Sequence, residues 1–189
     1  MPVLIGTFER VAFLVTPPSH AAWVDQRYID HPYLTLLHLL PGLVLFLFGP
    51  LQFSMVLRRK ALWLHRLIGR TFVVSAVLCG IGVCWMVIAF PALGGLLTQA
   101  VTFVLVAVMI VFMGLSIHAI RARKLVRHQA FMMRAYAIAL SVTTARIFID
   151  AAKWLFDLPF ETTFVIASSL GVILNCTFVE MLIYPRARR

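Results

Sequence analysis

The sequence predicts an all-α, polytopic membrane helical bundle with five transmembrane helices. Hydrophobic residues make up 62% of the 189 residues and charged residues only 13%, whereas soluble domains carry about 25% charged residues. Five apolar stretches are each long enough to cross the hydrocarbon of a bilayer, which takes roughly 20 helical residues. Basic residues gather in alternate connectors between these stretches. Together these observations favour an integral membrane protein.

The chain divides into an N-terminal segment and a single helical bundle. Residues 1–31 are predicted to lie at the membrane interface, because their apolar run is too short to span and is interrupted by Glu9 and Arg10. Residues 32–189 are predicted to form the transmembrane bundle. Short turns at Gly94–Gly95 and Asp157–Pro159 make consecutive spans antiparallel neighbours. The predicted spans are residues 32–57, 71–93, 95–120, 129–156 and 160–184.

The basic residues predict the orientation of the chain. Thirteen of the 17 Lys and Arg residues fall on one side, in the connectors after the first and third spans and in the C-terminal tail. Because cytoplasmic loops are enriched in Lys and Arg, we expect the N-terminus outside and the C-terminus in the cytoplasm, with the protein multi-pass in the inner (plasma) membrane. The net charge of +10 does not indicate nucleic acid as a partner, since these residues stand at helix ends. The lipid bilayer is the expected partner.

Four histidines in the spans or at their ends are candidate ligands for the iron of a b-type haem. His65, His118 and His128 lie at about the same depth near the cytoplasmic face, and His38 lies about two turns in from the exterior end. Neutral imidazole is a common axial ligand of haem iron. Beside His38, Pro41–Gly42 predicts a kink and a bare surface that a flat macrocycle could approach. The alternative is that these histidines bond to neighbouring helices or lipid headgroups.

Charged residues inside the spans form a second candidate site. Arg146, Asp150 and Lys153 share one helix face at i, i+4 and i+7. An arginine at mid-membrane costs about 2.5–3.5 kcal/mol, so Asp150 is expected to pair with it. This face could hold a haem propionate or a quinone, or it could be an internal ion pair that orients the helix. Glu180 in the last span is expected to pair with Arg134, Arg66 or a histidine.

Several motifs resemble the DUF2306 family of predicted bacterial membrane proteins over the first four spans, about two thirds of the chain. The chain departs from the family pattern at Phe72, where the family tends to have Tyr, and at Phe131, where it tends to have Trp. The resemblance implies an architecture similar to the histidine-bearing four-helix bundles of cytochrome b561. The matching positions are His31-Pro32, His38, Gly42, the GPLQF block at 49–53, His65-Arg66, Gly69-Arg70, His128, Met132, Arg134, Ala137 and Arg146.

Three functions remain open at this point, and the sequence does not decide whether the protein is an enzyme. The first is a b-type haem-binding electron carrier linked to the quinone pool and to redox partners. The second is a non-catalytic accessory subunit of a larger membrane complex. The third is transport of a solute or proton along the Arg146–Asp150 face, although the chain lacks the inverted repeats of typical secondary transporters.

Overall fold

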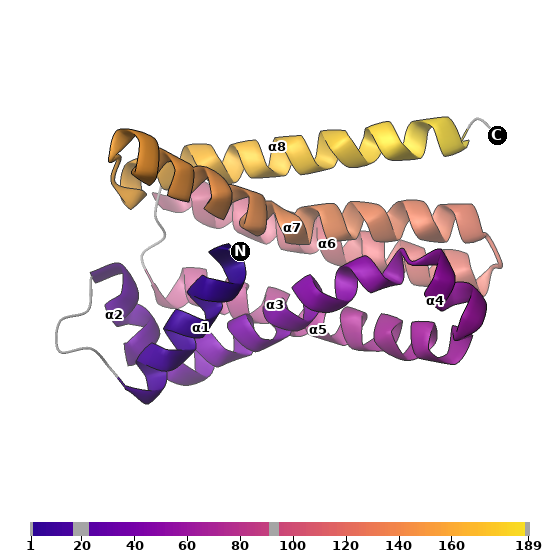
Figure 1. Cartoon of the computed structure of the whole chain (residues 1–189), viewed down its shortest axis with the longest axis horizontal. Coiled ribbons are helices and arrows are strands. Elements are labelled where there is room, and N and C mark those ends of the chain that lie inside the picture. The colour runs from indigo at the N-terminus through magenta and orange to yellow at the C-terminus, as the bar shows by residue number, and fades with distance from the viewer. Residues whose placement is uncertain (1, 17–22, 91–94, 188–189) are drawn as a thin grey trace. The chain divides into compact units, whose positions relative to one another are not determined.

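The computed structural model describes residues 2–16, 23–90 and 95–187, and within these ranges the chain is helical without β-strands (Figure 1). Five helices are long and apolar enough to cross a membrane, which confirms the predicted fold class. They are α3 (Pro32–Gln52), α5 (Leu62–Ala89), α6 (Gly95–Arg121), α7 (Leu125–Phe156) and α8 (Phe160–Ala187). Three shorter helices are α1 (Pro2–Val15), α2 (Trp23–Asp30) and α4 (Met55–Lys60).

Helix contacts divide the chain into two units, Val3–Pro91 (unit 1) and Ala92–Arg189 (unit 2). Each is described by itself. The single bundle over residues 32–189 and the interfacial location of residues 1–31 therefore stay predictions, as does the orientation of the termini. The predicted turn before Gly95 falls at residues 91–94, outside the described residues.

Unit 1 is built on the antiparallel pair α3 and α5, and its boundaries differ from those predicted. The first span ends at Gln52 rather than at residue 57, because the Ser54 hydroxyl accepts a hydrogen bond from the Leu57 amide (3.2 Å) and starts α4. The next span begins at Leu62 rather than at residue 71. Arginine favours helix, and its long side chain reaches polar surroundings from a helix end, so the basic stretch continues the helix instead of breaking it.

The N-terminal helices contact one end of the α3–α5 pair. The Arg10 guanidinium of α1 lies 4.6 Å from the centre of the Tyr28 ring of α2, and that ring meets Phe90 edge-on at 6.1 Å. The buried Thr35 hydroxyl donates to the Tyr28 carbonyl (2.9 Å). Cation–π and aromatic contacts thus hold α2 against the start of α3.

In unit 2, α7 is the central helix, and α6 and α8 each pack against it (Figure 1). Small residues spaced four apart face each other: Ser141 and Ala145 on α7 meet Ala167 and Gly171 on α8. A Cβ atom at Gly171 would lie only 2.5 Å from the Ser141 carbonyl oxygen. This close approach is the packing that membrane helices use in place of a hydrophobic driving force.

The turn between α7 and α8 is confirmed at residues 157–159. Asp157 ends α7 in the left-handed region (φ 51°) and forms an ion pair with Lys153 one turn earlier. The hydrogen bond from Lys153 lowers the pKa of the exposed Asp157 carboxyl. The carboxylate is therefore stabilised by the fold at neutral pH.

We expect Lys153→Gln to raise the pKa of Asp157 toward its ordinary value of about 3.9, as followed by carboxyl-carbon NMR. Because the pKa is lower in the folded chain than in the unfolded one, the pair contributes stability above the unfolded pKa, and this is lost as pH falls through the folded pKa. Lys124→Gln, in the α6–α7 turn, is the matched control and should leave the Asp157 titration unchanged. An unchanged titration in Lys153→Gln would contradict the pairing.

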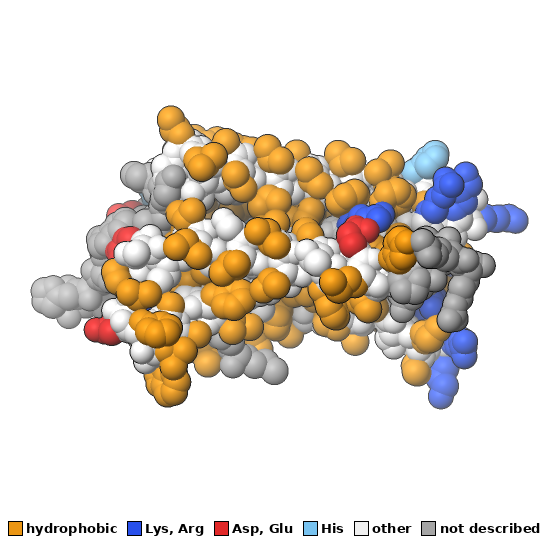
Figure 2. All heavy atoms as spheres, turned by 90° about the horizontal axis from the view of Figure 1, so that it is seen from above, with side chains coloured by type: hydrophobic (Ala, Val, Ile, Leu, Met, Phe, Trp, Pro, Cys, Tyr) orange, Lys and Arg blue, Asp and Glu red, His pale blue; other side chains and the backbone are white. Residues whose placement is uncertain are grey.

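The outer surfaces of the long helices are apolar. Large hydrophobic side chains stay exposed along them, including Trp85, Val104, Val142 and Ile166. Figure 2 shows hydrophobic side chains over most of the described surface in view. This distribution suits helices surrounded by lipid or by other membrane helices.

Candidate functional site

His38 lies at a close approach of α3 and α5. A Cβ atom at Gly82 would lie 3.0 Å from the backbone nitrogen and Cα of His38. The His38 Nδ1–H donates to the Cys79 carbonyl of α5 (3.2 Å), and Cys79 Sγ lies 3.4 Å from the same nitrogen. The predicted bare surface at Gly42 also faces Cys79. A Cβ atom at Gly42 would lie 3.5 Å from Cys79 Sγ. At this crossing, α5 side chains and backbone contact both His38 and Gly42.

His128 of α7 is fixed by Ser116 of α6. Its Nδ1 lies 3.1 Å from the Ser116 carbonyl and 2.7 Å from Ser116 Oγ, and that hydroxyl donates to the His128 carbonyl (3.1 Å). A carbonyl can only accept, so Nδ1 carries the proton in both His38 and His128. In metal-ligating histidines, the ring nitrogen that does not bind the metal commonly donates a hydrogen bond of this kind.

The structure does not bring His118 to His128 within unit 2. Ser116 is fully buried against α7, whereas His118 is exposed. Two positions along a helix turn the side chain by about 200°, so His118 points away from the α6–α7 contact. His65 belongs to unit 1, in the second turn of α5, and its Nδ1 is buried. Of the ligand sets proposed from the sequence, the His118–His128 pair is therefore not assembled within unit 2, and any set that joins His65 to these residues stays a prediction.

The predicted charged face, with Arg146, Asp150 and Lys153, lies on α7, and its role as a binding site stays a prediction. Arg146 is partly buried and Asp150, one turn on, is exposed. Lys153 forms its ion pair with Asp157. Among the residues that the structure describes, no group of three or more His, Cys, Asp or Glu side chains is placed to share a metal ion.

A cluster around Arg134 joins all three helices of unit 2. Arg134 Nε and Nη2 of α7 donate to the two carboxylate oxygens of Glu180 of α8 at 2.6 and 2.8 Å, which confirms one of the expected partners of Glu180. The same guanidinium lies 6.0 Å from the ring centre of Phe112 (α6) and 5.8 Å from that of Phe131 (α7). The two rings stack at 6.1 Å. A bidentate ion pair on an aromatic support therefore connects α6, α7 and α8.

A second polar contact between α7 and α8 lies deeper along the pair. The Thr144 hydroxyl donates to Asn175 Oδ1 (3.1 Å), and Asn175 Nδ2 donates to the Ala137 carbonyl (3.4 Å). The sequence predicted no partner for Asn175. Both side chains are polar residues within long apolar helices that are antiparallel neighbours, and this is the signal that could have indicated a contact between them.

Comparison with known proteins identifies one similarity. A family model described as "Predicted membrane protein (DUF2306)" matches residues 35–183. The match extends through the fifth span, beyond the four spans that carry the motifs. No curated protein and no solved structure matches the chain.

Proposed function

This chain belongs to the DUF2306 family of predicted membrane proteins, and from its own residues we propose that it is a non-catalytic accessory subunit of a larger membrane complex. The observation that supports this proposal is the use made of polar groups inside the spans. Arg134 is bonded to Glu180, Thr144 to Asn175, and His38 to the Cys79 backbone, each across a helix contact. Such bonds fix helix positions within a bundle.

The apolar outer faces support a partner chain. In unit 2, α6 and α8 each pack on α7, and their outer faces expose Val104, Val111, Ile166 and Phe178. Another membrane helix could cover either face. In this proposal the protein lies in the inner (plasma) membrane with its C-terminus in the cytoplasm, following the excess of basic residues on that side.

Photo-crosslinking in native membranes tests the proposal. A photoreactive amino acid at Val104 of α6 or Ile166 of α8 should give a protein adduct of defined mass from at least one of the two positions. The same variants, purified and reconstituted alone into vesicles, should lose that adduct. Lipid adducts alone at both positions in native membranes would contradict an accessory-subunit role.

The fixed imidazoles favour a second candidate, b-type haem binding with electron transfer. Where haem is bound, it supplies one-electron chemistry. In this candidate, His128 or His38 would hold the iron through Nε2, with His65 and His118 as the other candidate ligands. Arg146 would neutralise a propionate or bind a quinone. The fit is incomplete within each unit, since His118 points away from His128.

An absorption spectrum separates the two candidates. Under the accessory-subunit proposal, the protein purified from cells supplied with a haem precursor is colourless. A reduced b-type spectrum that disappears in His128→Ala or His38→Ala, and persists in the control His31→Ala, would establish the second candidate instead. His31 suits as the control because it is exposed at the N-cap of α3, outside the span.

A further inference from the structure

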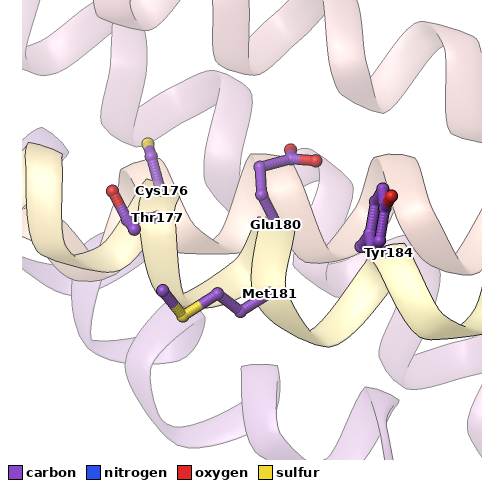
Figure 3. A pocket seen from close by; sticks show the side chains of 5 residues that line it. All are labelled: Cys176, Thr177, Glu180, Met181 and Tyr184. Carbon is purple, nitrogen blue, oxygen red and sulfur yellow. The ribbon is translucent and has the colours of Figure 1, made fainter.

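A shallow, open depression lies along α8, on the side that carries Glu180 (Figure 3). Its volume is about 610 Å³, and all of its lining residues belong to α8. Hydroxyl and carboxylate groups line it together with apolar side chains. The residues are Cys176, Thr177, Glu180, Met181 and Tyr184. Because the depression is open, it suits a ligand that is itself held in the bilayer.

The ion pair beside this depression presents an acceptor next to a donor. Glu180 is 54% exposed at its side chain and Arg134 is 27% exposed. Their bidentate contact uses two of the five N–H groups of the guanidinium and leaves lone pairs on both carboxylate oxygens. A ligand that carries a cation and an anion side by side would complement both groups.

The depression lies at the basic end of unit 2. The Arg134–Glu180 contact places the last turns of α8 beside the first turns of α7, where the α6–α7 connection gathers basic residues. Tyr184 is an aromatic residue of the kind found at membrane interfaces. From the basic residues and the interfacial aromatic, we expect this end to lie near the level of the phospholipid headgroups. The basic residues there are Arg121, Arg123, Lys124 and Arg127.

We propose that this depression binds the headgroup of a phosphoethanolamine lipid. The primary ammonium donates hydrogen bonds to Glu180, and the phosphate accepts from the remaining N–H groups of Arg134. A choline headgroup is a poorer ligand because its quaternary nitrogen has no N–H. A purely anionic headgroup is also poorer, because the carboxylate is the more exposed member of the pair and repels a second anion.

The test uses the purified full chain in nanodiscs with a fixed fraction of anionic lipid and a varied zwitterionic lipid. The headgroups compared are ethanolamine, N,N-dimethylethanolamine and choline, and native mass spectrometry counts the lipids retained. We expect retention to fall with methylation, by about tenfold from ethanolamine to choline, which corresponds to one charge-assisted hydrogen bond. Equal retention of ethanolamine and choline lipids would overturn the proposal.

Two variants test whether the preference for ethanolamine headgroups arises at Glu180. Glu180→Gln should abolish the discrimination between ethanolamine and choline, whereas Glu161→Gln, at the opposite end of α8, should keep it. A preference for ethanolamine that persists in folded Glu180→Gln would overturn the assignment to this depression. If Glu180→Gln does not fold, the methylation series on the natural chain still decides, because it requires no variant.

Discussion

Gly171→Leu should separate α7 from α8 and destabilise the protein by about 3 kcal/mol or more, the upper end of overpacking penalties. Even the first added atom would lie 2.5 Å from the Ser141 carbonyl oxygen and 3.1 Å from the Ala145 nitrogen. Both neighbours are backbone atoms of α7, so no side-chain rotation can relieve the clash. The helices must therefore move apart, and the Thr144–Asn175 contact on the same interface is lost with them.

The measurement is equilibrium unfolding in mixed micelles, together with spin-label distances between α7 and α8. Gly171→Ala should give a smaller loss in the same direction. Gly114→Leu is the matched control, because a Cβ atom at Gly114 of α6 has no neighbour within 4 Å. Equal stability of the Gly171 and Gly114 variants would show that the close α7–α8 contact does not hold the helices together.

The fold could be predicted because span length and apolar composition are properties of the sequence itself. The five long helices were predicted from those quantities. The break between α3 and α4 was missed, since the hydropathy stays high through Val56 and Leu57 while only the Ser54 cap interrupts the helix. A two-residue interruption changes the helix direction without changing the mean hydropathy.

The candidate site was less predictable, because partners depend on helix rotation and on the register between helices. The pairing of Glu180 with Arg134 followed from opposite charges at the same membrane level. The contact of His38 with Cys79 depends on which faces of α3 and α5 meet, and single-sequence periodicity does not fix this in helices that are apolar all round. Phe131 was noted only for replacing a family Trp, although it supports the Arg134 guanidinium.

Arg134→Glu should be the most damaging single charge change in unit 2. It removes both hydrogen bonds to Glu180, leaves two carboxylates facing each other, and withdraws the cation from Phe112 and Phe131. Hydrogen bonds to charged groups contribute about 1.5–3 kcal/mol. We therefore expect a loss of about 2–3 kcal/mol in the free energy of unfolding. This loss is smaller than that for breaking a fully buried ion pair, because both side chains are partly exposed.

The swapped pair, Arg134→Glu with Glu180→Arg, tests whether this loss arises from the pairing. The double variant restores the ion pair between α7 and α8 but moves the cation away from the aromatic rings, so we expect it to recover more than half of the lost stability. Arg127→Glu is the control, since it makes the same charge change at an exposed position near the start of α7. A double variant as unstable as Arg134→Glu would mean that the aromatic contacts, rather than Glu180, hold the guanidinium in place.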